Sequence, residues 1–336
     1  MNMKRRIKRI AVLGDGGWGT TLAIHLSKKK FIVTVWGAFP RYVKTLNKKR
    51  ENIKFLPGIK IPRANIAFSA DLNRTVQNAD LIILAIPSQY SERIIKQLKC
   101  LDLSRKILLS VIKGIENKSL MRISEIILKE LGKVRLAVLS GPTIASEVAK
   151  GIPSTAVIAC KDPKTAKLLQ EVINSETFRI YTNSDIIGVE MGGSIKNVIA
   201  IACGVCDGLG FGTNTKAAIL ARGLAEMARL GIAMGAQQKT FFGLSGLGDL
   251  ATTCFNPQSR NRSVGEALGR GKTISQIMGS MDMVAEGVST AKAIFSLSKK
   301  FDVSMPITQE VYNIIYRNKL PRTAVSDLMG RKTKPE

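Results

Sequence analysis

The architecture of this chain follows from the segment Ile10-Ala11-Val12-Leu13-Gly14-Asp15-Gly16-Gly17-Trp18-Gly19-Thr20. A short apolar run typical of a buried strand leads into a glycine turn, and an amphipathic segment follows it. Gly14 permits a tight turn, Gly16 lets backbone amides approach a pyrophosphate, and Gly19 lets the next helix pack closely on the sheet. This order predicts a dinucleotide-binding turn with phosphate at a helix N-terminus, and a plain glycine turn is the alternative.

The end of the second apolar run, residues 31–36, bears on which dinucleotide is bound. An NAD-selective fold carries an acidic residue there to hold the ribose 2′-hydroxyl, whereas this chain continues Gly37-Ala38-Phe39-Pro40-Arg41. Because no acid is present and Arg41 is near enough to accept a 2′-phosphate, the sequence favours NADP over NAD. The alternative is that Arg41 is an ordinary surface arginine.

Strand-like and helical patterns alternate through the first half of the chain, which predicts an α/β fold with a doubly wound, mostly parallel sheet. Beyond Ser184 the strand signal ends, and apolar residues repeat at helical spacing over 195–206 and 215–234. We therefore expect a dinucleotide-binding domain over 1–187 and an all-α domain over 188–336, with ligands bound in the cleft between them. The expected strands cover 9–13, 31–36, 66–69, 81–85, 106–111, 135–139, 155–160 and 178–181.

The chain of 336 residues is strongly basic, with 51 Lys and Arg against 25 Asp and Glu and a formal net charge of +26. These cations are dispersed along the chain, and the aromatic residues are only 5% of it, so no stacking platform for nucleic acid is evident. We expect weak, salt-sensitive contact with polyanions, no specific nucleic-acid recognition, and easier capture of a small phosphorylated substrate.

Other features of the composition point to a cytoplasmic protein without a metal. The apolar stretch after the basic N-terminus is too short for a signal peptide, and no apolar run predicts membrane insertion. The five cysteines are scattered and odd in number, so we expect free thiols. Cys203 and Cys206 form a CxxC that lacks two further zinc ligands, and His25, the one histidine, is expected to be a packing or surface residue.

Two lysines are candidates for the chemistry. Lys113 follows the strand at 106–111, at the sheet edge where open α/β folds bind ligands, although a solvated loop lysine fits the same position. Lys196 interrupts a buried apolar helix, so burial is expected to lower its pKa and suit it to proton transfer near neutral pH. Asp249, in a glycine-rich segment, is the expected partner of Lys196, and a purely structural ion pair is the alternative.

Two further segments are candidates for substrate binding. Ser140-Gly141-Pro142-Thr143-Ile144-Ala145 also follows a strand and offers backbone amides and a hydroxyl, or else forms a simple turn. In Asn256-Pro257-Gln258-Ser259-Arg260-Asn261-Arg262 we expect Asn256 to cap a helix that starts at Pro257. Amides at that helix start and the Arg260 guanidinium favour a phosphate, and an exposed helix start with incidental arginines is the alternative.

With these motifs in hand, nearly the whole chain resembles the bacterial NAD(P)-dependent glycerol-3-phosphate dehydrogenase family. The resemblance rests on five separated motifs: Gly14–Thr20, SGPTIASE at 140–147, GVEMGGSIKNVIA at 188–200, 243–250 together with QSRNR at 258–262, and VAEG at 284–287. It implies a Rossmann-type domain followed by a helical domain. It also implies the interconversion of dihydroxyacetone phosphate and sn-glycerol 3-phosphate, which supplies phospholipid synthesis.

The resemblance also implies roles for individual residues. Lys196 matches the proton acceptor, and Asp249, expected above as its catalytic partner, matches a substrate position. Substrate positions are matched by Lys113, Gly141, Thr143, Lys196, Asp249, Ser259, Arg260 and Asn261. Cofactor positions are matched by Gly17 and Trp18 in the turn, whose glycines Gly14, Gly16 and Gly19 are predicted above from the motif itself. The other matched cofactor positions are Lys113, Ala145, Arg260, Val284 and Glu286. Ala38 departs from the polar or basic residue frequent in relatives, which leaves 2′-phosphate recognition to Arg41.

Two rival functions remain at this point. A dehydrogenase of the same architecture that acts on a hydroxy acid or a ketopantoate-like substrate would prefer a carboxylate to a phosphate. A non-catalytic nucleic-acid-binding protein would account for the charge of +26 but lacks a recognisable binding motif. We expect the enzyme to act as a homodimer.

Overall fold

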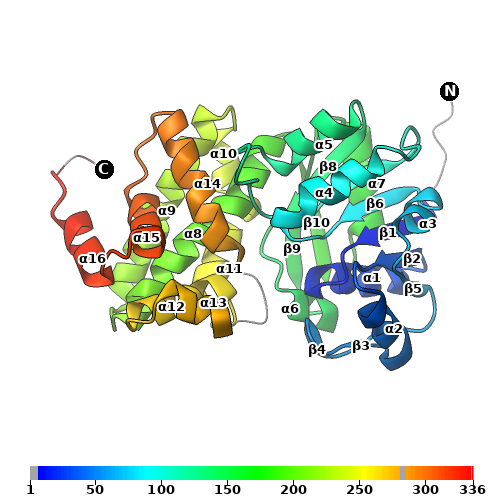
Figure 1. Ribbon diagram of the computed structural model, residues 1–336. Coiled ribbons are helices and arrows are strands. Elements are labelled where there is room, and N and C mark those ends of the chain that lie inside the picture. The colour runs from blue at the N-terminus through cyan, green and yellow to red at the C-terminus, as the bar shows by residue number, and fades with distance from the viewer. Residues whose placement is uncertain (1–6, 281–284, 334, 336) are drawn as a thin grey trace. The chain divides into compact units, whose positions relative to one another are not determined.

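The computed structural model describes residues 7–280, 285–333 and 335, and these form two compact units (Figure 1). The first unit comprises the described residues up to Ile112 together with Ile123–Ile186, and the second comprises Lys113–Arg122 and the described residues from Ile187 onward. The segment Lys113–Arg122 thus packs with the second unit, although the sequence pattern placed it in the first domain. The domain assignment 1–187 and 188–336 stays a prediction.

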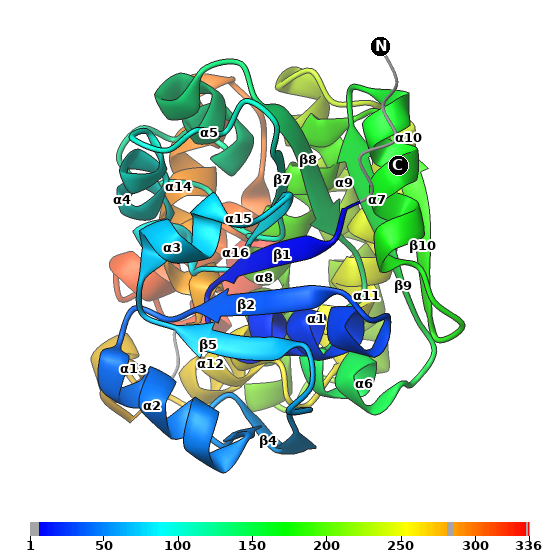
Figure 2. The ribbon, with the colours of Figure 1, turned by 90° about the vertical axis from the view of Figure 1, so that its right-hand side faces the viewer.

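An eight-stranded sheet with the order β10-β9-β8-β7-β6-β1-β2-β5 forms the centre of the first unit (Figure 2). Six strands run parallel, whereas β9 pairs antiparallel with β8 and β10 runs parallel to β9. The predicted α/β class with a mostly parallel sheet is therefore confirmed. The strands are β1 (Arg9–Leu13), β2 (Ile32–Trp36), β5 (Ile66–Ser69), β6 (Leu81–Leu84), β7 (Ile107–Ser110), β8 (Arg135–Ser140), β9 (Ser154–Cys160) and β10 (Phe178–Asn183).

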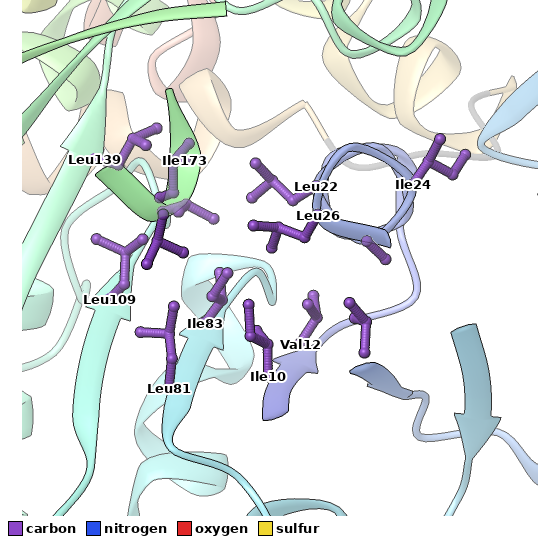
Figure 3. Close-up of a cluster of buried hydrophobic side chains, with 14 of the residues drawn as sticks. Ile10, Val12, Leu22, Ile24, Leu26, Leu81, Ile83, Leu109, Leu139 and Ile173 are labelled. Atoms are coloured by element: carbon purple, nitrogen blue, oxygen red, sulfur yellow. The ribbon is translucent and has the colours of Figure 1, made fainter. Parts of the chain in front are cut away.

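Both faces of this sheet are covered, because every residue of the central strands β6 and β7 is buried. On one face, Leu22 and Leu26 of the first helix pack against Ile10, Val12 and Ile83 (Figure 3). Each such side chain contributes about 1.5–3 kcal/mol when fully buried. The helices of this unit are α1 (Gly17–Lys28), α2 (Pro40–Lys49), α3 (Leu72–Gln77), α4 (Ser88–Leu98), α5 (Ile123–Leu131), α6 (Ala145–Lys150) and α7 (Pro163–Ile173).

Local signals in the sequence set several helix starts of this unit. Asp71 caps α3 by accepting from the Arg74 backbone N–H, and Asp162 caps α7 with Pro163 as the first helical residue. The sequence pattern did not predict the small antiparallel pair β3 (Glu51–Asn52) and β4 (Leu56–Lys60). A strand of two residues is too short for a period-2 pattern to be recognised.

The second unit is helical, as predicted, and its described residues include one isolated bridge, between Ile115 and Arg122, outside the helices. Its core surrounds the central helix α8 and includes Ile195, Val198 and Phe241. The elements are α8 (Ile186–Gly208), α9 (Thr213–Ala233), α10 (Gln238–Phe241), the π-helix η1 (Leu244–Gly248), α11 (Asp249–Phe255), α12 (Arg260–Gly269), α13 (Ile274–Ser280), α14 (Glu286–Lys300), α15 (Pro306–Tyr316) and α16 (Pro321–Met329).

Among the described residues, α8 is the one helix with the length and composition of a membrane-spanning segment, with a mean hydropathy of 1.4 over its most apolar stretch. However, 83% of that stretch is buried inside the protein. Packing on all sides explains why most of the α8 surface is apolar, since a helix surrounded by protein needs no solvent-facing polar side.

Candidate active site

The glycine turn connects β1 to α1 at a point where neighbouring backbone leaves no room for side chains. Gly14 has a φ of +126°, and a Cβ on it would lie 2.4 Å from the carbonyl oxygen of Ala85. A Cβ on Gly19 would lie 2.0 Å from the carbonyl oxygen of Gly14. These contacts hold α1 close to β1, so the start of the helix lies at the carboxyl end of the strand.

The N-terminus of α1 fits a dinucleotide pyrophosphate. Gly16 is the N-cap residue, no side chain caps the helix, and no atom lies within 4 Å of where a Gly16 Cβ would be. The first N–H groups of a helix lack partners within the helix and attract an anion. In the same turn the buried indole Nε1 of Trp18 has no hydrogen-bond partner. Ala145 lies beside this turn. Its carbonyl oxygen accepts a 3.0 Å hydrogen bond from Thr21 Oγ1, and its Cβ is 3.9 Å from the position that a Cβ on Gly17 would take.

The carboxyl group of Asp15 lies beside the end of β2, a placement that the sequence pattern did not predict. A Cβ on Gly37 would lie 2.2 Å from Oδ2 of Asp15. The Asp15 side chain, which belongs to the glycine turn, therefore lies against the end of β2. Asp15 Oδ2 is buried without a hydrogen-bond partner, and burial raises the pKa of this carboxyl group. Arg41, by contrast, is exposed in the first turn of α2.

The candidate substrate segment after β8 lies at the same edge of the sheet as the glycine turn, since β8 is parallel to β7, β6 and β1. Gly141 and Thr143 are brought together there, with Thr143 Oγ1 donating a 3.1 Å hydrogen bond to the Gly141 carbonyl. Ala145 follows as the first residue of α6.

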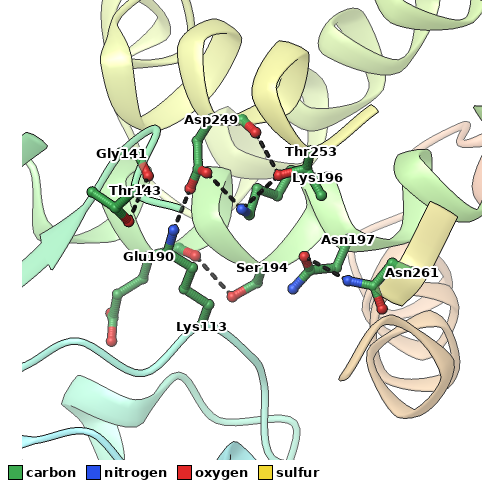
Figure 4. A network of polar contacts seen from close by, with 10 residues as sticks. All are labelled: Lys113, Gly141, Thr143, Glu190, Ser194, Lys196, Asn197, Asp249, Thr253 and Asn261. Atoms are coloured by element: carbon green, nitrogen blue, oxygen red, sulfur yellow. Dashed lines mark hydrogen bonds and ion pairs between the residues drawn. The ribbon is translucent and has the colours of Figure 1, made fainter. Parts of the chain in front are cut away.

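The second unit contains a buried carboxylate that binds two lysines (Figure 4). Lys196 Nζ lies 2.5 Å from Oδ1 of Asp249, and Lys113 Nζ lies 2.8 Å from its Oδ2. The expected pairing of Lys196 with Asp249 is therefore confirmed. The Lys196 side chain is only 8% exposed and the Asp249 side chain 1%. The placement of Lys113 on the same carboxylate was not expected from its position in the sequence.

The environment of Lys196 brings its pKa close to neutral. Burial, which penalises the charged ammonium, is the main cause and lowers this pKa to about 8; Asp249 opposes the shift and Lys113 adds to it. A lysine with such a pKa can both donate and accept a proton in the physiological range. The predicted direction of the shift is confirmed.

Two contacts of the second unit were not predicted from the sequence. Lys196 Nζ also donates a 2.7 Å hydrogen bond to Thr253 Oγ1, which in turn donates to the Asp249 carbonyl one turn earlier in α11. A buried pair, Arg122 Nη1 and Glu190 Oε2 at 2.7 Å, joins the end of the Lys113–Arg122 segment to α8. Asp249 and Thr253 are i and i+4 on one helix, a spacing that a helix assignment for 249–255 would have revealed.

The candidate phosphate segment begins a helix, but not where the sequence predicted. Asn256 is the C-cap residue of α11 rather than an N-cap, and its Oδ1 accepts from the Gln258 backbone N–H. The next helix, α12, starts at Arg260 and is capped by Ser259, whose Oγ accepts from the Arg262 N–H. The prediction was wrong by one turn because proline is also common just after a helix C-cap, and Asn-Pro also favours the start of a turn. Arg260 and Asn261 consequently occupy the first turn of α12.

The two arginines of this segment have different environments. Arg262 Nε is held 2.6 Å from Asp207 Oδ2, and Lys216 Nζ lies 2.9 Å from the other oxygen of Asp207. The Arg262 guanidinium thus forms a structural ion pair, and Arg260 is an exposed residue at the start of α12. Asp207 was not among the candidates from the sequence.

Close packing of α12 against α8 fixes the position of this helix start. A Cβ on Gly204 would lie 1.9 Å from the carbonyl oxygen of Arg262, and one on Gly265 would lie 2.0 Å from that of Ile201. Gly208 and Gly269 continue the contact one turn further along the two helices. Backbones this close leave little freedom to slide, so the register between Lys196 on α8 and Arg260 on α12 is set by these glycines.

Asn261, Glu286 and Val284 are the remaining site candidates, and Asn261 contacts α8 directly. Asn261 donates a 2.9 Å hydrogen bond from Nδ2 to Asn197 Oδ1, and its Oδ1 accepts one of the same length from the Gly287 N–H. Glu286 is the first residue of α14. Val284, also predicted to contact the cofactor, lies outside the described residues.

Cysteine and histidine residues take no part in this arrangement. All five cysteines are free, and burial raises the pKa of Cys206 to about 12, so its thiol is unreactive at neutral pH. His25 is a packing residue: its Nε2 lies 2.6 Å from the Ile173 carbonyl and its ring contacts Phe178 edge to face. Within the described part of the chain, no group of three His, Cys, Asp or Glu side chains is placed to hold a metal ion.

Comparison with known proteins identifies the family. The descriptions "NAD-dependent glycerol-3-phosphate dehydrogenase N-terminus" and "C-terminus" match residues 9–166 and 185–326. An NAD(P)+ glycerol-3-phosphate dehydrogenase from Citrifermentans bemidjiense is 47% identical over 332 residues, which cover 98% of this chain and 99% of the relative. One from Chlorobium limicola is 45% identical over 97% of this chain and 99% of the relative.

A solved structure agrees with these sequence matches. The crystal structure of glycerol-3-phosphate dehydrogenase from Coxiella burnetii is 36% identical, covers 96% of this chain and 99% of its own, and superposes with a TM-score of 0.93. Sequence and fold therefore agree that the chain belongs to the NAD-dependent glycerol-3-phosphate dehydrogenase family.

Proposed function

We propose that this chain is an NAD(P)-dependent oxidoreductase that interconverts dihydroxyacetone phosphate and sn-glycerol 3-phosphate. The observation that carries the proposal is Lys196, a buried ammonium with a pKa of about 8 that is 2.5 Å from Asp249 in a member of this family. Family membership supplies the substrate pair, and the lysine supplies the proton that the reaction requires.

The residues of the second unit bind the substrate and move its proton. Lys196 donates a proton to the oxygen that develops on substrate C2 and accepts it again in the reverse direction. Asp249 holds the ammonium in place through Oδ1, and its other oxygen fixes Lys113 on the same site. Arg260, Asn261 and Ser259 at the start of α12 bind the phosphate, since helix N–H groups and a guanidinium both favour a doubly charged anion.

The residues of the first unit bind the dinucleotide. The turn from Gly14 to Gly19 and the N-terminus of α1 receive the pyrophosphate, with Ala145 beside them. Gly141 and Thr143 follow β8 at the same edge of the sheet and serve the substrate, while Glu286 and Val284 serve the cofactor. When bound, the nicotinamide supplies or accepts the hydride at substrate C2.

Cofactor preference is a separate proposal. Arg41 is exposed in the first turn of α2 and can bind a 2′-phosphate, which favours NADP. Titrations with NADH and NADPH should show tighter binding of NADPH, and the Arg41→Ala variant should lose that difference. Equal loss of both affinities, or no loss at all, would contradict the role of Arg41.

The test of the main proposal is turnover with several carbonyl substrates. The purified protein should oxidise NADPH or NADH with dihydroxyacetone phosphate and leave ketopantoate and other keto acids unreduced. Lys196→Ala should lower kcat by a factor of about 10² to 10⁴, the usual contribution of general acid–base catalysis. Arg260→Ala should mainly raise KM for dihydroxyacetone phosphate. Preference for a keto acid, or unchanged turnover without Lys196, would refute the assignment.

We further propose that the enzyme acts in the cytoplasm as a homodimer and supplies glycerol 3-phosphate to phospholipid synthesis. Large apolar side chains at the C-terminal end are exposed, Leu320 by 70% and Met329 by 81%, and a second copy of the chain would cover such surface. Light scattering on the purified protein measures the subunit number directly, and a monomer would contradict the dimer.

A further inference from the structure

Both ends of the Asn261 carboxamide are bound by other parts of the protein. Nδ2 donates to Asn197 Oδ1 and Oδ1 accepts from the Gly287 N–H, each over 2.9 Å. Asn261 is 9% exposed and Asn197 is 5% exposed. The group of Asn261 that remains for a phosphate is its backbone N–H in the first turn of α12, where no preceding helical carbonyl accepts it.

The three residues joined here belong to three helices that meet at one point. A Cβ on Gly287 would lie 2.7 Å from the Asn197 carbonyl oxygen and 2.8 Å from Asn261 Oδ1. The first turn of α14 therefore contacts the backbone of α8 directly, and the Asn261 side chain closes the contact. Any movement of the first turn of α14 has to move this carboxamide or break its hydrogen bonds.

Each of these three residues directly follows a residue of the proposed site. Asn197 follows Lys196 on α8, Asn261 follows Arg260 on α12, and Gly287 follows Glu286 on α14. The proton-transfer lysine, the phosphate-binding arginine and a cofactor-binding glutamate are thus attached to one hydrogen-bonded junction.

We infer that the Asn261 side chain is a positioning residue that couples dinucleotide binding at the start of α14 to substrate binding at the start of α12. This inference rests on the proposed function, since the ligands at the two helix starts are those assigned above. A ligand that orders one helix start also orders the other, because both are bonded to the same carboxamide. Coupling of this kind is reciprocal, so each ligand tightens the binding of the other by the same factor.

The experiment measures NADH binding by nucleotide fluorescence, without and with saturating sn-glycerol 3-phosphate, a pair that cannot react because both are reduced. In the unaltered enzyme, sn-glycerol 3-phosphate should tighten NADH binding about fivefold or more, the lower range for coupled sites. Asn261→Ala, which removes both hydrogen bonds, should bring this factor close to one. Gly287→Ala should do the same, because its Cβ would lie 2.7 Å from the Asn197 carbonyl oxygen and 2.8 Å from Asn261 Oδ1 and would force the first turn of α14 away from both.

Asn313→Ala is the matched control. Asn313 is also a buried asparagine of the second unit, 8% exposed, and its Nδ2 bonds to Glu310 at 3.2 Å on the same helix. This variant should lower the melting temperature about as much as Asn261→Ala and keep the coupling factor of the unaltered enzyme. If Asn261→Ala does not fold, Asn261→Ser and Gly287→Ala provide the same comparison.

Three results would overturn the inference. The first is an unaltered enzyme that binds both ligands with a coupling factor of one. The second is a coupling factor that survives in both Asn261→Ala and Gly287→Ala. The third is an Asn261→Ala variant that loses only sn-glycerol 3-phosphate binding with its NADH affinity intact, as expected of a direct substrate ligand. Failure of the unaltered enzyme to bind sn-glycerol 3-phosphate at all would instead refute the proposed function, and this inference with it.

Discussion

The pKa of Lys196 should move in opposite directions when its two charged neighbours are removed separately. In the unaltered enzyme this pKa is about 8, with Asp249 raising it and Lys113 lowering it. Asp249→Asn removes the anion 2.5 Å from the ammonium, so the pKa should fall by one unit or more. Such a shift corresponds to at least ~1.4 kcal/mol against the charged form. Lys113→Gln removes a competing cation from the same carboxylate, so the pKa should rise.

These shifts have a calculable effect on the protonated fraction. At pH 8 the ammonium form of the unaltered lysine is about half of the total, and a fall of one unit reduces it to about a tenth. Reduction of dihydroxyacetone phosphate needs the ammonium, so its kcat/KM should decline as the pH rises through the pKa of the free enzyme. Oxidation of sn-glycerol 3-phosphate needs the neutral amine and should rise over the same range.

The assay is kcat/KM in both directions between pH 6 and pH 10, for the unaltered enzyme and the two variants. Midpoints are compared rather than absolute rates, because both variants also weaken substrate binding. Glu266→Gln, which breaks an exposed ion pair with Arg270 in the same unit, serves as the control and should leave the midpoint unchanged. Lys196 would be refuted as the titrating group if the midpoints of the pH profiles were the same in all three proteins. A shift of the midpoint in the same direction in Asp249→Asn and Lys113→Gln would refute it as well.

Three further predictions follow from other parts of the structure. Gly16→Ala should leave the melting temperature unchanged, since its Cβ meets no atom within 4 Å. The same substitution should raise the NADH dissociation constant about tenfold or more, because the Cβ fills the proposed pyrophosphate position. An unchanged NADH affinity would contradict the proposed cofactor site. Asp207→Asn should raise KM for dihydroxyacetone phosphate about tenfold with little change in kcat. The reason is that Arg262 loses its charged partner and the start of α12 becomes less ordered. A decrease in kcat with an unchanged KM would contradict this role of Asp207. Burial lowers the pKa of His25 below its usual 6.5, so the unfolded chain binds that proton more readily and the free energy of unfolding should fall as the pH drops below about 6.5. Denaturant titrations should show a smaller fall in His25→Gln, and equal falls would exclude this histidine as a cause.

Much of the first unit was predictable from the sequence because its signals are local. Glycines at 14, 16 and 19 after an apolar strand specify a turn, and aspartate before a helical segment specifies a cap, as at Asp162. The carboxyl group of Asp15 shows where this reasoning ends. Its contact with the end of β2 depends on the pairing of β1 with β2, and this pairing cannot be predicted from the sequence of either strand alone.

The candidate site in the second unit was predicted in its residues more than in its contacts. A lysine in an apolar helix is costly without a partner, so Lys196 and the need for a carboxylate were both inferable. That Lys113 binds the same carboxylate was not, because this contact joins residues 136 positions apart. Its segment also packs with a unit to which its flanking residues do not belong.

The packing of α12 on α8 explains why α12, the proposed phosphate-binding helix, could not be placed from its own sequence. Gly204 and Gly208 on one helix, and Gly265 and Gly269 on the other, are spaced four residues apart and present a flat strip to each other. Taken separately, each pair only weakens its helix, by about 1 kcal/mol per glycine relative to alanine. Their value becomes visible only when both helices are considered, because a methyl group on either strip would overlap a backbone carbonyl of the other. The register between Lys196 and Arg260, the residues proposed for proton transfer and phosphate binding, is therefore specified by four residues without side chains. A substitution such as Gly204→Ala should consequently impair both the stability of this unit and substrate affinity, although Gly204 is not among the proposed substrate-binding residues.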